Sequence, residues 1–478
     1  MTFDMLPDDV LLKIFDFYVD EEQRIRIGKW VMLVHVCRRW RSVVFHSPRR
    51  LNLRLVVTPK SPARDTLDVW PPLPLIIHDS SSILHSSTSN VDNIVAALEH
   101  NDRTCQIQLK YLTRSQFESL TNSAAMQKPF PELADLQLGM FDDGGRVARP
   151  ILPDSFLCRT APRLRSLELS DIPFPGLPKL LLSTTHLVNL DLFNISPSGY
   201  IPPEVMATSL SALTSLNFLR LRFRHPRPRP ALESRRLPLP LLSRSILPSL
   251  SKIIFKGASE YLEVILARIH APRLNKMLIT LFNQLIFDTP QLFQFISRTP
   301  TLSAPENGHI AFNSKAITVR FPSRTPDYGV LSVRIPCTAS EWQLSSLEQL
   351  STSSFPSLST LEDLYIFEYG GHPLHWQDDV ENTLWLELLR PFAAVKNIHL
   401  SEEYVPRIAP TLKELVGGGT TEVLPSLENI FLEGFQPSGP LHEGIETFVA
   451  SRRLTSRPVA VSLWEMDPEQ NAYYHYKY

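Results

Sequence analysis

A six-residue pattern, apolar-x-x-apolar-x-apolar, recurs nine times along the chain and limits the folds that the chain can adopt. Successive copies begin 23 to 34 residues apart, except for one interval of 87 residues. The last three positions alternate apolar and variable residues, which is typical of a short strand with one buried face. Strands at such intervals predict a repetitive architecture. The copies begin at Leu133, Leu164, Leu187, Leu216, Leu250, Leu274, Leu361, Val395 and Leu427.

The segments between the copies have the pattern of helices or single turns. Val91, Ile94, Val95 and Leu98, for example, follow helical spacing. Strands that alternate with helices predict an α/β fold, a curved solenoid with parallel strands on one side and helices on the other. Further helices are expected near 115–123, 261–269, 292–298, 380–389 and 443–451. Further strands are expected at 51–57, 73–77, 105–109 and 458–464, and loops at 58–72 and 80–90.

The 87-residue interval is the irregular part of the chain. Within it, residues 316–321 and 330–335 alternate like strands but lack the leading leucine. They could be two atypical repeats or an antiparallel excursion from the solenoid. We favour atypical repeats.

Proline is abundant, with 41 prolines against 17 glycines in 478 residues. This excess could indicate disorder, but 43% of the residues are hydrophobic, enough to bury a core. Proline lacks an N–H and disfavours helix in the residue before it, so it can end a helix and lead into a strand. It stands two residues before five of the nine copies, at Pro131, Pro162, Pro248, Pro272 and Pro425, and Pro356 precedes Leu358 in the same way.

The first fifty residues follow a different pattern, with helices expected at 6–18 and near 30–45. Pro7 suits a first helical turn, and Asp8 and Asp9 place negative charge at the positive end of the helix dipole. Such a small helical segment is marginal unless it packs on something else. It could be a cap on the rest of the chain or a docking module for another protein. The apolar face of the first helix comprises Val10, Leu11, Ile14, Phe15 and Tyr18.

The N-terminal residues resemble an F-box over about residues 4–48. The family pattern has an LP start, an I-F pair and a V-C-R-x-W-R segment, which here are Leu6-Pro7, Ile14-Phe15 and residues 36–41. The resemblance departs in the charged connection at 20–29, which is longer. It implies binding to a Skp-type adaptor and, through the adaptor, to a cullin–RING complex. Carried over by position, the adaptor-binding residues are Leu6, Pro7, Val10, Ile14, Phe15, Val36, Cys37 and Trp40.

The remainder resembles the leucine-rich-repeat F-box proteins common in fungi. We therefore divide the chain into an F-box (1–48), a leucine-rich-repeat-like solenoid (49–464) and an aromatic tail (465–478). The resemblance implies a non-catalytic, substrate-recognition subunit of an SCF-type ubiquitin ligase, or alternatively a non-degradative interaction scaffold. A protein substrate of unknown identity would bind the inner strand face, which a solenoid presents as a concavity. Candidate contacts on that face are Gln137, Glu168, Asp191, Arg220, Tyr365 and His399.

An arginine-rich stretch begins in the fourth copy of the pattern. Arg220, Arg222 and Arg224 alternate along the expected strand and could line one exposed face. The stretch could be a solvated insertion or a contact for an acidic or phosphorylated segment of a partner, since arginine binds such groups bidentately. A nuclear-import signal or a nucleic-acid contact is the weaker interpretation, because the 48 basic and 49 acidic residues nearly balance.

Composition and motifs exclude several classes of protein. The four cysteines are far apart and form no CxxC pair, which argues against a zinc module and favours a reducing compartment. No apolar run approaches about 18 residues, and the start lacks the pattern of a signal peptide. We expect an intracellular soluble protein, cytoplasmic, nuclear or both, that does not engage membranes. Motifs for cofactors and metals are lacking, since the glycines at 417–419 and the histidines at 372 and 375 fit ordinary loops better.

Overall fold

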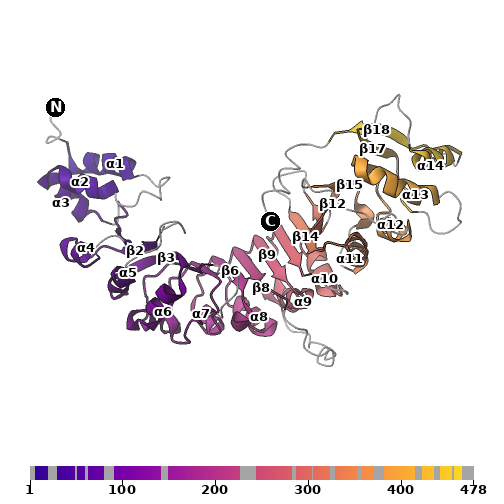
Figure 1. The fold of residues 1–478 in the computed structure, drawn as a ribbon. Helices are drawn as coiled ribbons and strands as arrows, with labels where there is room; N and C mark the ends of the chain where they lie inside the picture. The colour runs from indigo at the N-terminus through magenta and orange to yellow at the C-terminus, as the bar shows by residue number, and fades with distance from the viewer. Residues whose placement is uncertain are drawn as a thin grey trace. The chain divides into compact units, whose positions relative to one another are not determined.

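A computed structural model gives the fold of the chain (Figure 1). The chain divides into two units, Met1–Leu216 and Asn217–Tyr478. The structure describes residues 6–19, 29–48, 51–59, 63–79, 91–141, 149–226, 244–282, 287–303, 305–322, 329–353, 358–369, 382–414, 423–434, 442–454 and 457–465. The predicted loop at 80–90, most of the predicted C-terminal tail, and the histidines at 372 and 375 lie outside these ranges.

Unit 1 begins with three short helices, α1 (Asp8–Val19), α2 (Lys29–Val36) and α3 (Arg38–His46). The first helix was predicted correctly, but the prediction of a single second helix near 30–45 was wrong. The chain is interrupted at Cys37, whose backbone is extended with φ −157°. The Cys37 Sγ atom accepts a hydrogen bond from the backbone N–H of Trp40 at 3.4 Å, so it caps the start of α3.

These helices share a hydrophobic core with the segment that follows them. The indole Nε1 of Trp30 donates to the carbonyl of Arg54 at 3.0 Å, and its ring meets Trp70 edge-on at 5.3 Å between centroids. Trp70 follows α4 (Ala63–Val69), a helix within the range predicted as a loop. That prediction was wrong because Leu67 and Trp70 pack on the core and stabilise a helical turn there. The module is therefore packed on the rest of unit 1, as expected of a cap.

Six strands of unit 1 pair in chain order and all in parallel. They are β1 (Leu55–Val57), β2 (Leu75–Asp79), β3 (Thr104–Leu112), β4 (Asp135–Met140), β5 (Ser166–Ser170) and β6 (Asn189–Ile195). The register aligns Leu136, Leu167 and Leu190, the second apolar position of three copies of the pattern, and all three are fully buried. One buried leucine row therefore runs across adjacent strands.

Unit 2 continues the same strand pattern. Its repeat strands are β7 (Phe218–Phe223), β9 (Lys252–Gly257), β11 (Lys276–Leu281), β15 (Asp363–Glu368), β16 (Asn397–Leu400), β17 (Asn429–Glu433) and β18 (Ala460–Trp464). Neighbouring repeat strands in this sheet pair in parallel, while β8 (Ser245–Ile246) and β10 (Ile269–His270) form a separate parallel pair. Each of the nine copies of the pattern forms a strand, which confirms the predicted α/β class.

The 87-residue interval holds an antiparallel excursion, so the prediction of two atypical repeats was wrong. Here β12 (Asn307–Asn313), β13 (Ala316–Phe321) and β14 (Val330–Pro336) give the strand order β11-β14-β13-β12-β15. The middle strand β13 is antiparallel to both of its neighbours. Only two residues join β12 to β13, whereas a parallel pair needs a crossover of a dozen or more.

Helices cover one face of the strands in each unit (Figure 1). Thr113 and Gln116 form a capping box at the start of α6 (Arg114–Asn122), with the Gln116 side chain accepting from the Thr113 N–H at 2.8 Å. The six helices predicted between strands are confirmed. In unit 1 the helices are α5 (Val91–Leu98), α6 (Arg114–Asn122), α7 (Leu177–Ser183) and α8 (Pro203–Ser211). In unit 2 they are α9 (Ser259–Arg268), α10 (Pro290–Ser297), α11 (Ser340–Ser353), α12 (Asn382–Leu389), α13 (Val405–Glu414) and α14 (Glu443–Leu454).

A turn precedes each of the nine copies of the pattern. The backbone N–H of the leading residue donates to the carbonyl three residues earlier, as Leu164 does to Ala161 at 3.0 Å. The five prolines noted above therefore occupy the second position of a four-residue turn, as Pro162 does here. Proline favours that position because its φ is already fixed near −65°. Five of the 41 prolines are thus explained by turns that lead the chain into its strands.

Candidate protein-interaction surfaces

Helices α1 and α2 expose several large apolar side chains. On α1 these residues follow helical spacing on the side away from the core. Ile14 is 41% exposed and Phe17 is 85% exposed, although both are apolar. Water contact with such side chains is unfavourable, and a cluster of them indicates a protein-interaction site. The exposed apolar residues are Val10, Ile14, Phe17 and Tyr18 on α1 and Met32 and Val36 on α2; we call this set the N-terminal apolar surface.

The structure separates the predicted adaptor-binding residues into two groups. Phe15 is fully buried, and its ring lies 4.8 Å from that of Trp40. The expectation that Phe15 contacts an adaptor directly is therefore corrected, because its side chain forms core. Trp40 is half-buried beneath the same helix. Leu6 is half-buried, while Pro7, Val10, Ile14, Val36 and Cys37 are exposed.

Electrostatic contacts fix the start of α1 against α3. The Arg39 guanidinium forms an ion pair with Asp8 at 2.8 Å and also donates to the carbonyl of Leu6. This pair is partly exposed and contributes little stability. It does orient the Leu6-Pro7 segment beside α3.

Phe17, Tyr18 and Met32 belong to the N-terminal apolar surface but were not among the predicted site residues. Phe17 lies three residues after Ile14, so helical spacing alone places it beside that residue. Helical spacing is therefore a usable signal for this residue, but no position of the family pattern pointed to these three side chains.

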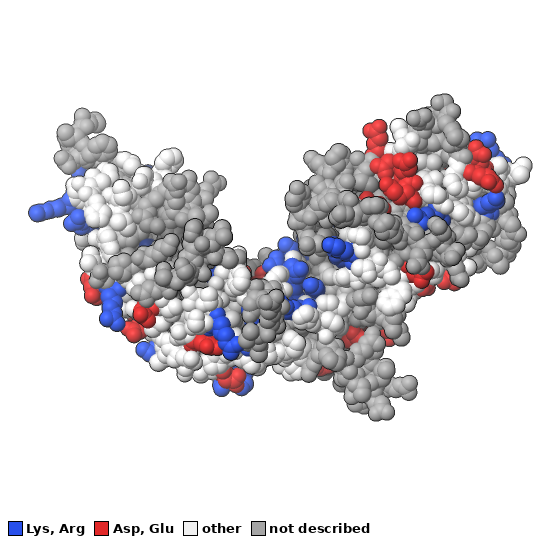
Figure 2. All heavy atoms as spheres, viewed as in Figure 1, with Lys and Arg blue, Asp and Glu red and all other residues white. Residues whose placement is uncertain are grey.

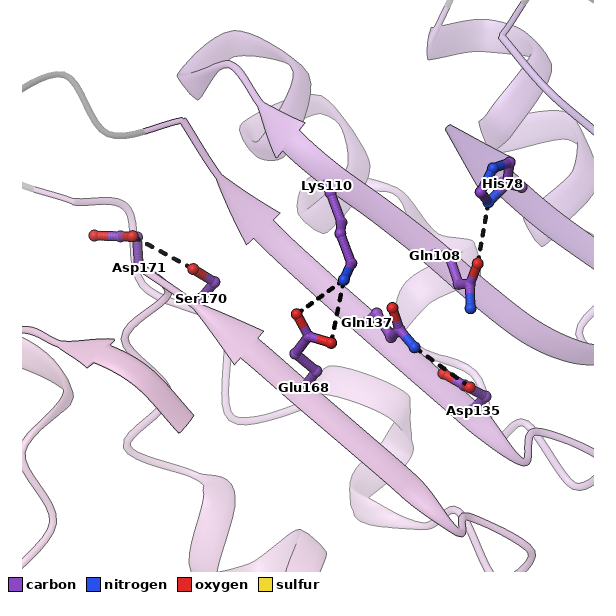
Figure 3. Close-up of polar contacts among 8 residues, drawn as sticks. All are labelled: His78, Gln108, Lys110, Asp135, Gln137, Glu168, Ser170 and Asp171. Carbon is purple, nitrogen blue, oxygen red and sulfur yellow. Dashed lines mark hydrogen bonds and ion pairs between the residues drawn. The ribbon is translucent and has the colours of Figure 1, made fainter. Parts of the chain in front are cut away.

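The sheet of unit 1 presents a polar row on the face opposite its helices (Figure 3). Register aligns the predicted residues Gln137, Glu168 and Asp191, so the structure brings these three together. Lys110 reaches from β3 across β4 to Glu168, at 3.0 Å and 3.2 Å from the two carboxylate oxygens. Gln137 donates to Asp135 at 3.4 Å. Much of the hydrogen-bonding capacity of this row is therefore used by contacts within the sheet.

Burial affects the ionisation of Asp135, which lies two residues before Gln137 on β4. It raises the pKa of Asp135, the hydrogen bond from Gln137 opposes this rise, and the nearby charge of Glu168 adds to it. His78 and Gln108 continue the row at 3.1 Å from each other. A mixed polar surface of this kind suits contact with a polypeptide better than acid–base catalysis.

Unit 2 carries cations on the corresponding face of its sheet. Arg220 and Arg222 lie on β7, and Arg224 follows that strand; all three are half-buried. Arg220 and Lys252 each lie over the ring of Phe218, at 5.2 Å and 5.1 Å from its centroid. In Figure 2, basic side chains gather in the region where Figure 1 labels β9 and β14. The remainder of the arginine-rich stretch, residues 227–243, lies outside the described ranges.

A stacked row of rings occupies the other end of the same face. His399 lies between Tyr365 and Phe431, with centroids 4.0 Å and 4.5 Å away and nearly parallel planes. Trp464 meets Tyr365 and His399 at 5.9 Å and 5.6 Å. Tyr365 and His399, both predicted as substrate contacts, are thus direct neighbours. Burial lowers the pKa of His399 to about 4, which keeps the stacked imidazole neutral.

His309 joins this row from β12 and was not predicted. Its ring lies 4.7 Å from that of Tyr365. Burial, and then the charges of Arg320 and His399, lower its pKa to about 3. Beside the rings, Asn397 donates to Asp363 at 2.7 Å and Asn429 donates to Asn397 at 2.8 Å, so a polar ladder borders them.

The described part of the chain lacks the features of a metal site, a disulfide or a membrane-spanning helix. Within it, no group of three or more His, Cys, Asp or Glu side chains is placed to hold a metal ion. The four cysteines form no disulfide. Across the same ranges, no helix combines the length and apolar character needed to cross a bilayer.

Comparisons with known proteins give a family match for the N-terminal segment. Residues 3–53 match the F-box-like family, which in general supplies protein-interaction modules for Skp-type adaptors. Among solved structures, the leucine-rich repeat-containing protein LegL7 from Legionella pneumophila is similar, with 13% identity and a TM-score of 0.27. That match covers 85% of this chain and 98% of LegL7. No curated protein matched the chain.

Proposed function

We propose that this chain is a substrate-recognition subunit of an SCF-type ubiquitin ligase. The observation that carries the proposal is the N-terminal apolar surface, which lies within the segment that matches the F-box-like family. Apolar and aromatic side chains that become desolvated supply most of the binding energy at protein interfaces. A Skp-type adaptor would cover this surface and link the chain to a cullin–RING complex.

The proposed adaptor contacts are exposed residues of the module together with the half-buried Leu6. Phe15 and Trp40 would support the interface indirectly, because the contact between their rings holds α1 against α3. The burial of these two rings agrees with such an indirect role, since a buried ring can fix the position of an exposed residue on the same helix without touching the adaptor. The contacts are Leu6, Pro7, Val10, Ile14, Phe17, Val36 and Cys37.

The solenoid would hold the protein substrate on the open face of its strands. The chain would contribute proximity rather than chemistry, because tethering raises the effective concentration of substrate lysines near the ubiquitin carrier. The polar row of unit 1 and the cations and rings of unit 2 are the chemical groups available on that face. Their variety suits a polypeptide rather than a single small ligand.

The direct test is Ile14→Asp in the full-length chain, with binding to a purified Skp-type adaptor as the readout. Placing a carboxylate in the N-terminal apolar surface should abolish adaptor binding, because the interface would have to bury an unpaired charge. Leu454→Asp is the matched control, since Leu454 on α14 is 88% exposed and receives the same change. Adaptor binding by Ile14→Asp at the affinity of the control would refute the proposal.

Cullin recruitment separates the ligase from an interaction scaffold. If the adaptor complex of the unmodified chain also binds a cullin, the ligase function is supported. If the adaptor binds but the cullin does not, the chain is a non-degradative scaffold instead. Both outcomes are read by size-exclusion chromatography of the mixed components.

A further inference from the structure

The cations of unit 2 come from strands that are neighbours in the sheet but distant in sequence. Strands β7, β9, β11, β14 and β13 are consecutive in the sheet, and with the next strand, β12, they contain no Asp or Glu. Each of the first five contributes at least one Lys or Arg. We call the set the basic face: Arg220, Arg222, Lys252, Lys256, Lys276, Arg320 and Arg334.

Register concentrates three of these charges in one row. Arg222 pairs with Lys256, and Lys256 is followed across Thr280 by Arg334. Burial, and then the positive charges of Arg222 and Arg334, lower the pKa of Lys256. Like charges held this close destabilise the fold, so an anionic partner would gain by relieving their repulsion.

The basic face adjoins the rings already described. Arg334 donates to the Tyr369 hydroxyl at 3.1 Å, and a second row runs from Arg320 through His309 to Tyr365. Adjacent strands are about 4.8 Å apart, so the three strand intervals between β14, which carries Arg334, and β15, which carries Tyr365, amount to about 14 Å. An extended peptide rises about 3.3 Å per residue and spans that distance in about four residues.

The rings argue against a nucleic acid as the occupant. Single-stranded nucleic acids bind by stacking bases on accessible ring faces. Tyr365 and Phe431 cover both faces of His399, and Phe367 and Tyr369 are almost fully buried. Beyond β12 the strands also carry acids, Asp363 and Glu368 on β15 and Glu433 on β17, which limits the extent of positive charge.

We propose that the basic face binds an acidic segment of a protein in extended conformation, running across the strands. Asp or Glu side chains of that segment lie over Arg222, Lys256 and Arg334. An apolar residue about four positions beyond the acid over Arg334 packs against Tyr365 and Trp464. The proposal deepens the substrate-binding role proposed above by giving the chemistry of the partner.

Peptide binding without any adaptor tests this inference, so its failure would leave adaptor binding through α1 untouched. The probe is a fluorescent peptide with four consecutive Asp or Glu residues followed by a Leu four positions later. Lys256→Glu and Arg334→Glu should each weaken its binding by about tenfold, and added salt should weaken binding to the unmodified chain. Lys256→Gln should have a smaller effect in the same direction. Arg273→Glu is the control, since Arg273 is exposed and lies in a turn outside the basic face.

Three outcomes would overturn the proposal. The first is unchanged peptide affinity in both Lys256 variants. The second is binding of a phosphoserine version of the peptide but not of the carboxylate version, and the third is tighter binding of an oligouridine RNA than of the peptide. Moving the Leu eight positions from the acidic run should reduce affinity, and equal affinity would refute the role of the rings.

Discussion

Two phenylalanines on α1, only two residues apart, should respond to alanine substitution in opposite ways. Phe15 is fully buried and packs on Trp40, whereas Phe17 is 85% exposed. If the N-terminal apolar surface binds an adaptor, Phe17→Ala should affect binding and Phe15→Ala should affect folding. The pair therefore separates an interface residue from a core residue within one helix.

The magnitudes follow from burial. Removing a fully buried phenylalanine costs about 3–5 kcal/mol of unfolding free energy through lost transfer energy and the cavity left behind. Phe17→Ala should leave stability within about 0.5 kcal/mol, because little of the ring is buried and alanine favours helix. Burying a whole apolar side chain contributes about 1.5–3 kcal/mol, and 85% of that is about 1.3–2.5 kcal/mol. Adaptor binding should therefore weaken about 10- to 70-fold in Phe17→Ala.

Hydrogen exchange and calorimetry together give the readout. Phe15→Ala should lose amide protection in α1, α2 and α3 while the strands of unit 2 keep theirs. Phe17→Ala should retain protection throughout and lose affinity for a Skp-type adaptor in titration calorimetry. Full adaptor affinity in Phe17→Ala, or unchanged protection in Phe15→Ala, would refute the assignment of surface and core.

Three further predictions concern the stability of unit 2. Burial lowers the pKa of His399 from 6.5 to about 4. The free energy of unfolding that the neutral imidazole contributes is therefore complete above about pH 6.5 and is lost as the pH falls towards 4. His399→Phe keeps the ring stack and should flatten that fall in urea unfolding, whereas an unchanged pH profile would contradict the reasoning. Burial raises the pKa of Glu263 to about 7 against two opposing backbone hydrogen bonds, so its stabilising contribution is present below pH 4.5 and declines towards pH 7. Glu263→Gln should remove this decline, and persistence of the decline would assign it to another group. Gly444→Ala should destabilise α13 and α14 by about 1–3 kcal/mol, because the new Cβ would lie 2.5 Å from the Ala409 carbonyl oxygen. Hydrogen exchange of the two helices measures this loss, and a gain in stability would contradict the close packing.

The repeat strands could be predicted because each apolar position of the pattern has one physical role. Leu164 and its equivalents begin a strand from a turn, and the next two apolar residues point into the core. The pattern predicts these strands even where the intervals between copies vary, since each turn and strand depends only on residues within one copy. Helix α4 escaped prediction because its stability depends on packing with distant residues such as Trp30.

The sides of α1 were harder to predict than the helix itself. Val10, Leu11, Ile14, Phe15 and Tyr18 form one broad apolar face by spacing. The structure turns Leu11 and Phe15 inwards and leaves Ile14 outside, because α2 and α3 cover only part of that face. Hydrophobicity alone does not distinguish a core from an interface when both are apolar. The basic face was equally hidden, since Lys256 and Arg334 become neighbours only through strand register.

The inverted strand order within the 87-residue interval also decides which chemistry meets on the sheet. In chain order, β12 would follow β11 and β14 would precede β15. Arg334 would then lie beside the rings of β15, and His309 would lie among the cations of β9 and β11. The observed order β11-β14-β13-β12-β15 instead places Arg334 near Lys256 and brings the His309 ring to 4.7 Å from that of Tyr365. The hairpin that interrupts the repeats therefore groups the basic strands on one side of the rings of β15 and β16, with Arg334 in contact with Tyr369. A partner that contacts both the cations and the rings must cross the strands rather than follow one of them.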